Sequence, residues 1–374
     1  MASDKVAFFL PSLGGGGGGP GGAERITLNL AGELVSRGYG AELVLADLSR
    51  AYHSLIPAGV HVIDLGSARV SRCLRSLSSY LKREKPQALL SSLDHGNVVA
   101  IWAGRLARVR TRIVVANHIQ LSVATQEASN LRGRLVPWFV RHSYKRADAI
   151  VSVSHGAAAD LSRIAGIPIE RINVIYNPVL SSRVFEMAIE SPDHPWLANG
   201  EPPLIIAAGR LTRQKNFGLL LEAFSIVRRQ QIAKLIIFGE GEERHQLEQR
   251  VKDLQLAADV SLPGWSTNVY AFMARANLFV LSSLWEALPT VLIEALALGL
   301  PVVSTDCRSG PREILRDGEY GTLVPVGDAE LLARGMGEEL ARPRRTVPKE
   351  FLRPFEVSFA TEQYLNVLGL QQHA

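Results

Sequence analysis

The stretch KVAFFLPSLGGGGGGPGGAERITLNLAGELVS (residues 5–36) contains the first strand, turn and helix that the sequence predicts. Residues 5–10 are an apolar run typical of a buried strand. Residues 23–36 place apolar side chains at helical spacing, and Gly38 is suited to ending that helix. Eight of the nine positions from 14 to 22 are glycine, so the turn between strand and helix lacks side chains. This order of elements favours an α/β fold with a parallel sheet.

Strand and helix patterns alternate along the rest of the chain with one interruption. We expect further strands at 41–46, 88–91, 112–116, 149–154, 172–175, 204–208, 234–238, 260–262, 278–282 and 301–305. We expect further helices at 97–107, 131–146, 157–164, 217–228, 244–254, 269–274, 291–298 and 357–368, with two more short segments at 311–315 and 321–324. Five prolines between 178 and 203 interrupt the alternation and predict a linker. The chain is therefore expected to form two doubly wound α/β domains in series.

The composition is that of a soluble globular protein, with 47% hydrophobic and 21% charged residues among 374. The N-terminal apolar run is too short for a signal peptide, and no apolar run is long enough to span a membrane. Two cysteines, Cys73 and Cys307, cannot form a disulfide framework, which favours a cytoplasmic location. No obvious metal-binding pattern is present.

The positive charge is concentrated in the first half of the chain. Residues 1–180 hold 21 Lys and Arg against 12 Asp and Glu, whereas residues 181–374 hold 20 against 24. A basic half is suited to an acidic partner such as a phosphorylated substrate or an anionic lipid surface. Scattered arginines that only keep the domain soluble are an equal alternative.

The glycine run supports two interpretations. Glycine backbone followed by a helix N-terminus is suited to binding an anion, because N–H groups face the ligand without side chains in between. Residues 14–19 also satisfy the dinucleotide-binding pattern, so a nicotinamide-dependent oxidoreductase is an alternative function. A surface loop without a ligand is the structural alternative.

A second loop follows the expected strand at 204–208. It carries Arg210 and Lys215, and ligands of parallel sheets bind where such loops leave the strands. Two cations at this edge are suited to a diphosphate. Farther on, Glu286 precedes the helix that begins near Pro289 and Thr290, and Glu294 lies about one turn inside it. Carboxylates at these positions can bind sugar hydroxyls, while N–H groups of the first helical turn face phosphate.

The sequence as a whole resembles the retaining GT-B glycosyltransferases of family 4, the group 1 set. The resemblance is carried by Gly21–Arg25, Val153-Ser154, Tyr176–Val179, Gly209–Thr212, Gly239–Glu242, the Glu286/Glu294 pair and Asp306–Leu315. It implies two Rossmann-like domains facing across a cleft. Residues 1–178 would bind the acceptor, 179–202 would be the linker, 203–350 would bind the nucleotide sugar, and a C-terminal helix in 351–374 would pack back toward the N-terminal domain.

The resemblance also implies roles for individual residues. Arg210 and Lys215 would neutralise the departing diphosphate, Glu286 would bind the donor hexose, and Glu294 would bind the donor ribose. The N–H groups of Leu288, Pro289 and Thr290 would receive phosphate or sugar oxygens. Further residues implied are Gly264 and Trp265 beside the base, Gly239 in the donor site, Gly21 and Gly22 near the diphosphate or acceptor, and His118 as the active-site histidine.

The implied reaction moves a hexose or N-acetylhexosamine from a UDP-sugar to a lipid-linked or polysaccharide-precursor acceptor, forming an α-linkage without a metal cofactor. A UDP-sugar epimerase on a similar scaffold is an alternative. Ala287 stands where the family usually has glycine, which puts the width of the donor site in question. Residues 131–146 combine aromatic and basic side chains, which favours either core packing alone or peripheral contact with the inner face of the cytoplasmic membrane. A nucleic-acid partner is not expected.

Overall fold

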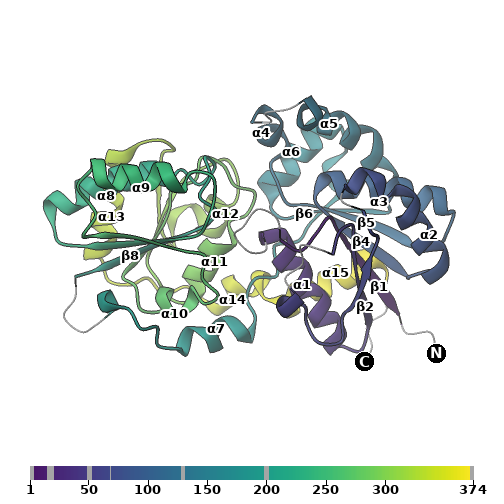
Figure 1. Ribbon diagram of the computed structural model, residues 1–374, viewed down its shortest axis with the longest axis horizontal. Coiled ribbons are helices and arrows are strands. Elements are labelled where there is room, and N and C mark those ends of the chain that lie inside the picture. The colour runs from purple at the N-terminus through teal and green to yellow at the C-terminus, as the bar shows by residue number, and fades with distance from the viewer. Residues whose placement is uncertain are drawn as a thin grey trace. The chain divides into compact units, whose positions relative to one another are not determined.

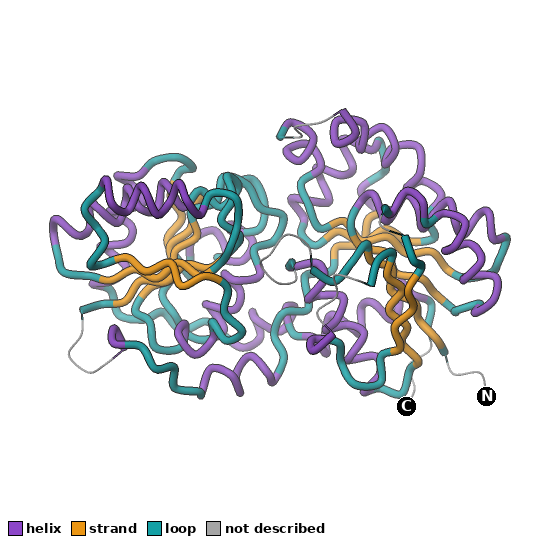
Figure 2. The backbone as a smooth tube through the Cα atoms, in the orientation of Figure 1, coloured by secondary structure: helices purple, strands orange, loops and turns teal. Residues whose placement is uncertain are grey.

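The computed structural model describes residues 4–14, 21–48, 53–67, 69–127, 131–197 and 202–370. These residues form two compact units (Figures 1 and 2). The first contains residues 4–14, 21–179 and 354–370, and the second contains residues 180–353. Most of the expected glycine loop, residues 15–20, lies outside the described residues.

The first unit has a seven-stranded sheet in the order β3-β2-β1-β4-β5-β6-β7, and all of its pairings are parallel. The strands are β1 (Lys5–Leu10), β2 (Gly40–Leu45), β3 (His61–Asp64), β4 (Ala88–Ser92), β5 (Arg112–Asn117), β6 (Ala149–Ser152) and β7 (Ile172–Val174). The helices of this unit are α1 (Gly22–Ser36), α2 (Leu74–Glu84), α3 (Asp94–Ala107), α4 (Leu121–Gln126), α5 (Leu131–Ser143), α6 (His155–Ala165) and α15 (Val357–Leu368).

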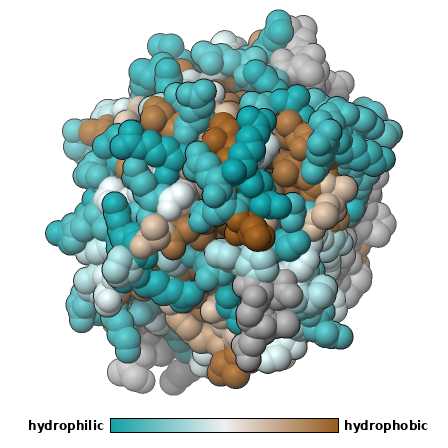
Figure 3. All heavy atoms as spheres, turned by 90° about the vertical axis from the view of Figure 1, so that its left-hand side faces the viewer, coloured by the Kyte–Doolittle hydropathy of each residue, from teal (hydrophilic) through white to brown (hydrophobic). Residues whose placement is uncertain are grey.

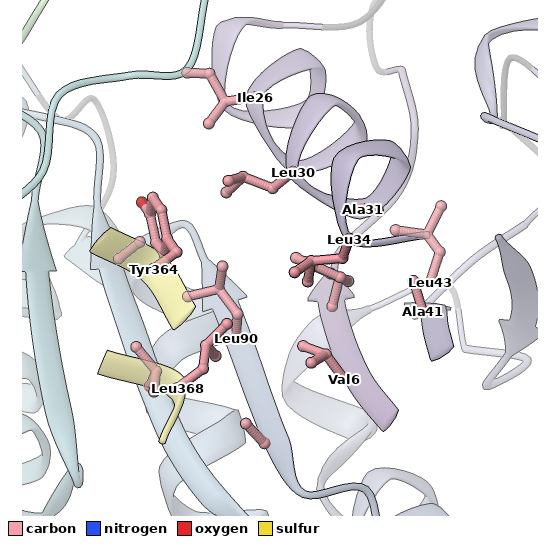
Figure 4. Packing of buried hydrophobic residues seen from close by; sticks show 14 of the residues in the cluster. Val6, Ile26, Leu30, Ala31, Leu34, Ala41, Leu43, Leu90, Tyr364 and Leu368 are labelled. Atoms are coloured by element: carbon pink, nitrogen blue, oxygen red, sulfur yellow. The ribbon is translucent and has the colours of Figure 1, made fainter. Parts of the chain in front are cut away.

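The core of the first unit lies on both faces of this sheet, because its central strands are apolar on both sides. Helices α1 and α15 cover one face, and α2, α3, α5 and α6 cover the other. Figure 4 shows the first of these layers, in which Tyr364 and Leu368 from α15 belong to one cluster with aliphatic side chains of α1, β1, β2 and β4. The C-terminal helix therefore belongs to the core of the first unit.

The second unit has a six-stranded parallel sheet in the order β10-β9-β8-β11-β12-β13. The strands are β8 (Leu204–Ala208), β9 (Lys234–Phe238), β10 (Val260–Gly264), β11 (Leu278–Leu281), β12 (Val302–Thr305) and β13 (Thr322–Val324). The helices are α7 (Ser182–Ile189), α8 (Phe217–Gln230), α9 (Arg244–Asp253), α10 (Tyr270–Met273), α11 (Thr290–Ala297), α12 (Pro311–Ile314), α13 (Ala329–Ala341) and α14 (Lys349–Leu352). Helices α8, α9 and α13 pack on one face of the sheet.

The strand order defines one switch point in each sheet. On the two sides of this point, successive strands are added in opposite directions across the sheet. The point lies between β1 and β4 in the first unit and between β8 and β11 in the second. Ligands of open α/β sheets bind outside the carboxyl ends of the strands at such points. The fold therefore marks two candidate positions, one in each unit.

The segment expected to be a linker, residues 179–202, differs from that expectation. It contains α7, which packs against α10 within the second unit and buries Val184 and Ala188. The prolines on either side of this helix end the neighbouring elements without preventing a short amphipathic helix between them. The second unit thus begins at Leu180 rather than at residue 203.

Candidate active site

Two loops meet at the switch point of the second unit. One follows β8 and runs from Gly209 to Asn216, and the other follows β11 and leads to α11. The Leu284 backbone N–H donates to the Gln214 carbonyl oxygen at 2.8 Å, and the Gln214 side-chain amide donates to the Trp285 carbonyl oxygen at 2.9 Å. These bonds hold the two loops together without requiring a ligand.

The ammonium group of Lys215 is paired with Glu286 at the centre of this site. Lys215 Nζ lies 2.5 Å from Glu286 Oε1, and the Ser283 hydroxyl donates to the same oxygen at 2.7 Å. Both charged side chains are largely buried, at 16% and 7% exposed. A charge removed from water needs such a partner, so any anion that binds Lys215 must compete with Glu286.

Gly209 makes room for the lysine. A Cβ atom at this position would lie 3.0 Å from Lys215 Cε, so the lysine stem packs directly over the glycine backbone. Arg210, the next residue, has an exposed side chain that makes no hydrogen bond or ion pair with any described residue. The site therefore contains two cationic side chains, Lys215 paired with Glu286 and Arg210 exposed to solvent.

Glu294 lies on the fifth residue of α11 and is 1% exposed. The Tyr270 hydroxyl donates to Glu294 Oε1 at 2.9 Å, so the carboxylate is oriented by α10. Helix α11 begins at Thr290 without a side-chain cap. Leu288 and Thr290 have backbone N–H groups at this end, but the expected donation by Pro289 is wrong because proline has no N–H.

Gly310 supports the loop before α11. Its φ is +89°, and a Cβ atom there would lie 2.5 Å from Pro289 Cδ and 3.1 Å from the Ala287 carbonyl oxygen. A side chain at this position would displace the start of α11. Only glycine both adopts this positive φ readily and lacks the Cβ atom that would collide here.

Gly239 and Gly264 have structural reasons to be glycine. A Cβ atom at Gly239 would lie 1.9 Å from the Gly209 carbonyl oxygen, and one at Gly264 would lie 2.5 Å from Glu240 Oε1. The two are joined by a hydrogen bond from the Gly239 N–H to the Gly264 carbonyl oxygen at 2.9 Å. The neighbouring Trp265 has a partly exposed ring. Their expected roles in donor binding remain predictions.

Cys307, directly after β12, is close to the same charges. Burial raises the pKa of its thiol far above the usual range, Glu286 raises it further, and Lys215 opposes both. The thiol therefore stays protonated at physiological pH and provides no nucleophile.

The first unit holds the other expected site residues. His118 follows β5, and burial lowers its pKa to about 4, while the neighbouring Asn177 side chain slightly opposes this shift. The imidazole is therefore neutral at physiological pH. Gly21 caps α1, where its N–H donates to the Glu24 carboxylate, and a Cβ atom on Gly22 would meet no atom within 4 Å.

Neither a metal cluster nor a membrane span is found in the described ranges. No group of three His, Cys, Asp or Glu residues among them could hold a metal ion. No helix within the same ranges is long and apolar enough to cross a membrane. One face of the molecule is shown in Figure 3, where hydrophilic side chains predominate and hydrophobic ones form small separate groups.

Comparison with known proteins agrees with this architecture. Residues 20–183 match the family described as Glycosyltransferase Family 4, and residues 190–347 match Glycosyl transferases group 1. The lipopolysaccharide core biosynthesis glycosyltransferase LpsE of Rhizobium meliloti is 30% identical over 87% of this chain and 87% of its own. The chain belongs to the group 1 glycosyltransferases. The expected family and the glycosyltransferase activity are thereby confirmed, whereas the retaining mechanism and the UDP-sugar donor remain predictions.

Other group 1 glycosyltransferases and solved structures are similar over nearly the whole chain. A Campylobacter jejuni protein named N-acetylgalactosamine-N,N'-diacetylbacillosaminyl-diphospho-undecaprenol 4-alpha-N-acetylgalactosaminyltransferase is 28% identical over 89% of both chains. Anabaena HepE, solved with UDP-glucose, superposes with a TM-score of 0.75 at 20% identity, covering 98% of this chain and 99% of its own. Sucrose-phosphate synthase from Thermosynechococcus elongatus reaches a TM-score of 0.79 at 18% identity, covering 97% and 98%. These likenesses confirm the fold of two Rossmann-like domains.

Sequence reasoning did not find the residues that hold the two carboxylates. Ser283 lies three residues before Glu286, a spacing that a turn brings together, and this signal could have been used. Tyr270 is on a different helix from Glu294, and nothing in the sequence links the two. The ion pair between Lys215 and Glu286 was not expected either, because each was assigned to a different part of the donor.

Proposed function

We propose that this glycosyltransferase moves a hexose or N-acetylhexosamine from a UDP-sugar to a lipid-linked or polysaccharide-precursor acceptor, with retention at the anomeric carbon and an α-linkage in the product. The Lys215–Glu286 pair beside the exposed Arg210 supports this proposal, because a cation suited to a phosphate is in contact with a carboxylate suited to sugar hydroxyls. The names of the C. jejuni relative and of the HepE complex support a diphospholipid acceptor and a UDP donor.

Binding of the diphosphate rearranges this pair in the proposed mechanism. A phosphate oxygen takes the place of Glu286 on Lys215, and Arg210 binds a second phosphate oxygen. Glu286, released from the lysine and still hydrogen-bonded to Ser283, then accepts a hydrogen bond from the donor sugar. Glu294, oriented by Tyr270, binds the ribose hydroxyls.

The transfer itself breaks the bond between the anomeric carbon and the diphosphate oxygen. The acceptor hydroxyl oxygen bonds to the same face of that carbon, and its proton passes to the departing phosphate. Stabilisation of the negative charge on that phosphate by Arg210, Lys215 and the N–H groups at the start of α11 is the main contribution of the protein. No metal is part of the proposal.

The first unit supplies the acceptor side in this proposal. Gly21 and Gly22 lack side chains at the start of α1, and no atom of the described residues lies within 4 Å of a Cβ atom built on Gly22, which favours close approach of a ligand. His118 contributes as a neutral imidazole, which can donate and accept hydrogen bonds with sugar hydroxyls.

Contact with an anionic membrane is the third part of the proposal. Residues 95–147 contain nine Lys and Arg but one acidic residue, Glu127. Exposed Trp102 and Leu106 on α3 and exposed Trp138 and Phe139 on α5 lie in the same region, on two helices that pack together (Figure 1). We call these four side chains the exposed apolar surface. Apolar side chains among arginines are suited to the interface of an anionic bilayer.

The donor is tested by ligand-induced changes in thermal unfolding with UDP-, GDP- and ADP-sugars. A UDP-sugar should raise the melting temperature, and UDP should be released when a short-chain prenyl-diphosphate-linked N-acetylhexosamine is added. Stabilisation by GDP- or ADP-sugars alone would contradict the proposed donor. Release of UDP without formation of a larger glycan would contradict the proposed acceptor.

A further inference from the structure

The switch point of the first unit is as elaborately built as that of the second. Leu93 follows β4 there with φ +77° and ψ 127°, a conformation that is costly for a residue other than glycine. This backbone turn places Asp94 in the first turn of α3, where it is 5% exposed. Strain of this kind persists where the surrounding structure enforces it, and it occurs often at ligand sites.

One oxygen of Asp94 is held by an internal network. The Tyr144 hydroxyl donates to Asp94 Oδ1 at 2.5 Å, and Asn117 Nδ2 donates to the same oxygen at 3.3 Å. Asn97 Nδ2 in turn donates to the Tyr144 oxygen at 2.8 Å. Three side chains from α3, β5 and the end of α5 therefore fix the orientation of this carboxyl group.

The other oxygen of Asp94 has no hydrogen-bond partner among the described residues, although it is buried. The same is true of Asn97 Oδ1, Asn117 Oδ1, Ser91 Oγ and Ser152 Oγ. All five atoms belong to the carboxyl ends of β4, β5 and β6 or to the first turn of α3. A buried polar atom without a partner costs about 1–3 kcal/mol, so this concentration at one edge of the sheet favours a polar partner there, either a ligand hydroxyl or ordered water.

We infer that Asp94 anchors a hydroxyl group of the acceptor sugar, with Oδ2 as the contacting atom and Tyr144, Asn97 and Asn117 as positioning residues. A hydroxyl is suited to this place because it can donate to the carboxylate and amide oxygens and accept from the serine hydroxyls around Asp94. Burial raises the pKa of Asp94, in keeping with a partner that is neutral. This inference rests on the proposed transfer to a sugar acceptor.

The test compares acceptor binding by Asp94→Ala, Asp94→Asn and the wild-type protein. Calorimetric titration in the presence of UDP, with the short-chain prenyl-diphosphate-linked N-acetylhexosamine as probe, should give a Kd about tenfold or more higher for Asp94→Ala. Asp94→Asn should recover part of the affinity, because an amide also pairs with a hydroxyl. The KM for the donor should change less than the Kd of the probe in both variants.

Asp160 provides a matched control in the same unit. It is also buried, but both of its oxygens have protein partners, the Ser122 N–H and Arg163. Asp160→Asn should lower the thermal stability without changing the Kd of the probe. Tyr144→Phe, which keeps the ring and removes one donor to Asp94, should raise that Kd by a smaller factor.

Equal probe affinity in the wild-type protein and both Asp94 variants would overturn the inference, since the free oxygen would then bind ordered water only. A rise in the donor KM equal to that for the acceptor would also overturn it. Failure of the proposed function looks different: the wild-type protein would release no UDP in the presence of this acceptor. If Asp94→Ala does not fold, Asp94→Asn and Tyr144→Phe still decide the question.

Discussion

Lys215 is the residue on which the account depends most. Its ammonium group is nearly buried, its stem packs over Gly209, and its charge is balanced by Glu286 in the unliganded protein. The sequence pattern correctly predicted that Lys215 lies in a loop at the carboxyl end of a strand in a parallel sheet. It could not predict the ion pair, because the two partners are 71 positions apart in the sequence and the sheet order brings them together.

Replacing Lys215 with methionine should reduce transfer by about 100-fold or more, because a positioned charge on the leaving group is lost. Lys234 is a matched control, since it is 17% exposed and pairs with Asp259 in the same unit. Lys234→Met should lower the free energy of unfolding. Its kcat should stay within about twofold of the wild-type value, the smallest change that the assay is expected to resolve. Near-normal turnover in Lys215→Met, measured by UDP release, would contradict the role given to Lys215.

Gly22 offers a second test at the residue scale. Gly22→Ala should not lower the melting temperature, because a Cβ atom there meets no atom of the described residues within 4 Å, but it should lower kcat/KM if a substrate approaches this backbone. Gly218 is equally open and lies in the first turn of α8. Gly218→Ala should be neutral in both assays. Unchanged kcat/KM in Gly22→Ala would remove the start of α1 from the site.

His118 should make stability depend on pH. Its pKa is about 4 in the folded protein and about 6.5 when unfolded, so the unfolded chain binds more protons between these values. Stability should therefore fall as pH falls from about 6.5 to 4, by up to about 3 kcal/mol from this group. Urea unfolding of His118→Asn should show a flatter pH dependence, and the exposed His142→Asn should not. An equally steep dependence in His118→Asn would assign the effect to other groups.

At the scale of elements, most helices and the inner strands were predicted, whereas the helices α2 and α13 and the edge strand β3 were not. Strand β3 lies at a sheet edge, and its first and last residues are exposed. Its sequence therefore contains no apolar run that would predict a strand. Helix α13 contains Gly335 and Gly337, which lower helix propensity, yet Leu332 and Met336 bury one face of it. Residues 311–314 form the short helix α12, which begins at Pro311, and Leu315 is the residue at its C-terminal end.

Helix α5 is the element on which the proposed membrane contact depends. Its inner side chains, such as Val140, pack in the core, while Trp138 is 56% exposed. The core-packing alternative thus accounts for one side of the helix and leaves the other without a structural role. Arg146 lies over the ring of Trp102 at 5.3 Å, which joins α3 to the same surface.

The double variant Trp138→Ser/Phe139→Ser should sediment less with vesicles that contain anionic phosphatidylglycerol. It removes apolar area that would enter the bilayer interface, about 1.5–3 kcal/mol for a fully buried side chain. Ile232→Ser, a substitution of another exposed apolar residue, should bind like the wild-type protein. Equal binding to neutral and anionic vesicles by all three proteins would contradict the membrane proposal. The proposal would also be contradicted if the protein bound DNA and the Trp138→Ser/Phe139→Ser variant weakened that binding as much as it weakens binding to vesicles.

At the scale of the whole molecule, the sequence predicted two Rossmann-like units and the family. Alternating strand and helix patterns sufficed for the two units, because a parallel sheet needs buried strands and covering helices in that order. The family was predicted from the resemblance of its motifs. The boundary was harder to predict, since composition cannot distinguish a proline-rich linker from a short helix such as α7. The network around Asp94 was also beyond reach, because it joins three elements through hydrogen bonds that leave no periodic pattern.

A crystal structure of the protein with UDP would test the central claim most directly. We predict the diphosphate at the switch point between β8 and β11, with a phosphate oxygen about 3 Å from Lys215 Nζ and Glu286 separated from the lysine. The start of α11 should donate to the same diphosphate. UDP bound elsewhere, with the Lys215–Glu286 ion pair intact, would contradict the account.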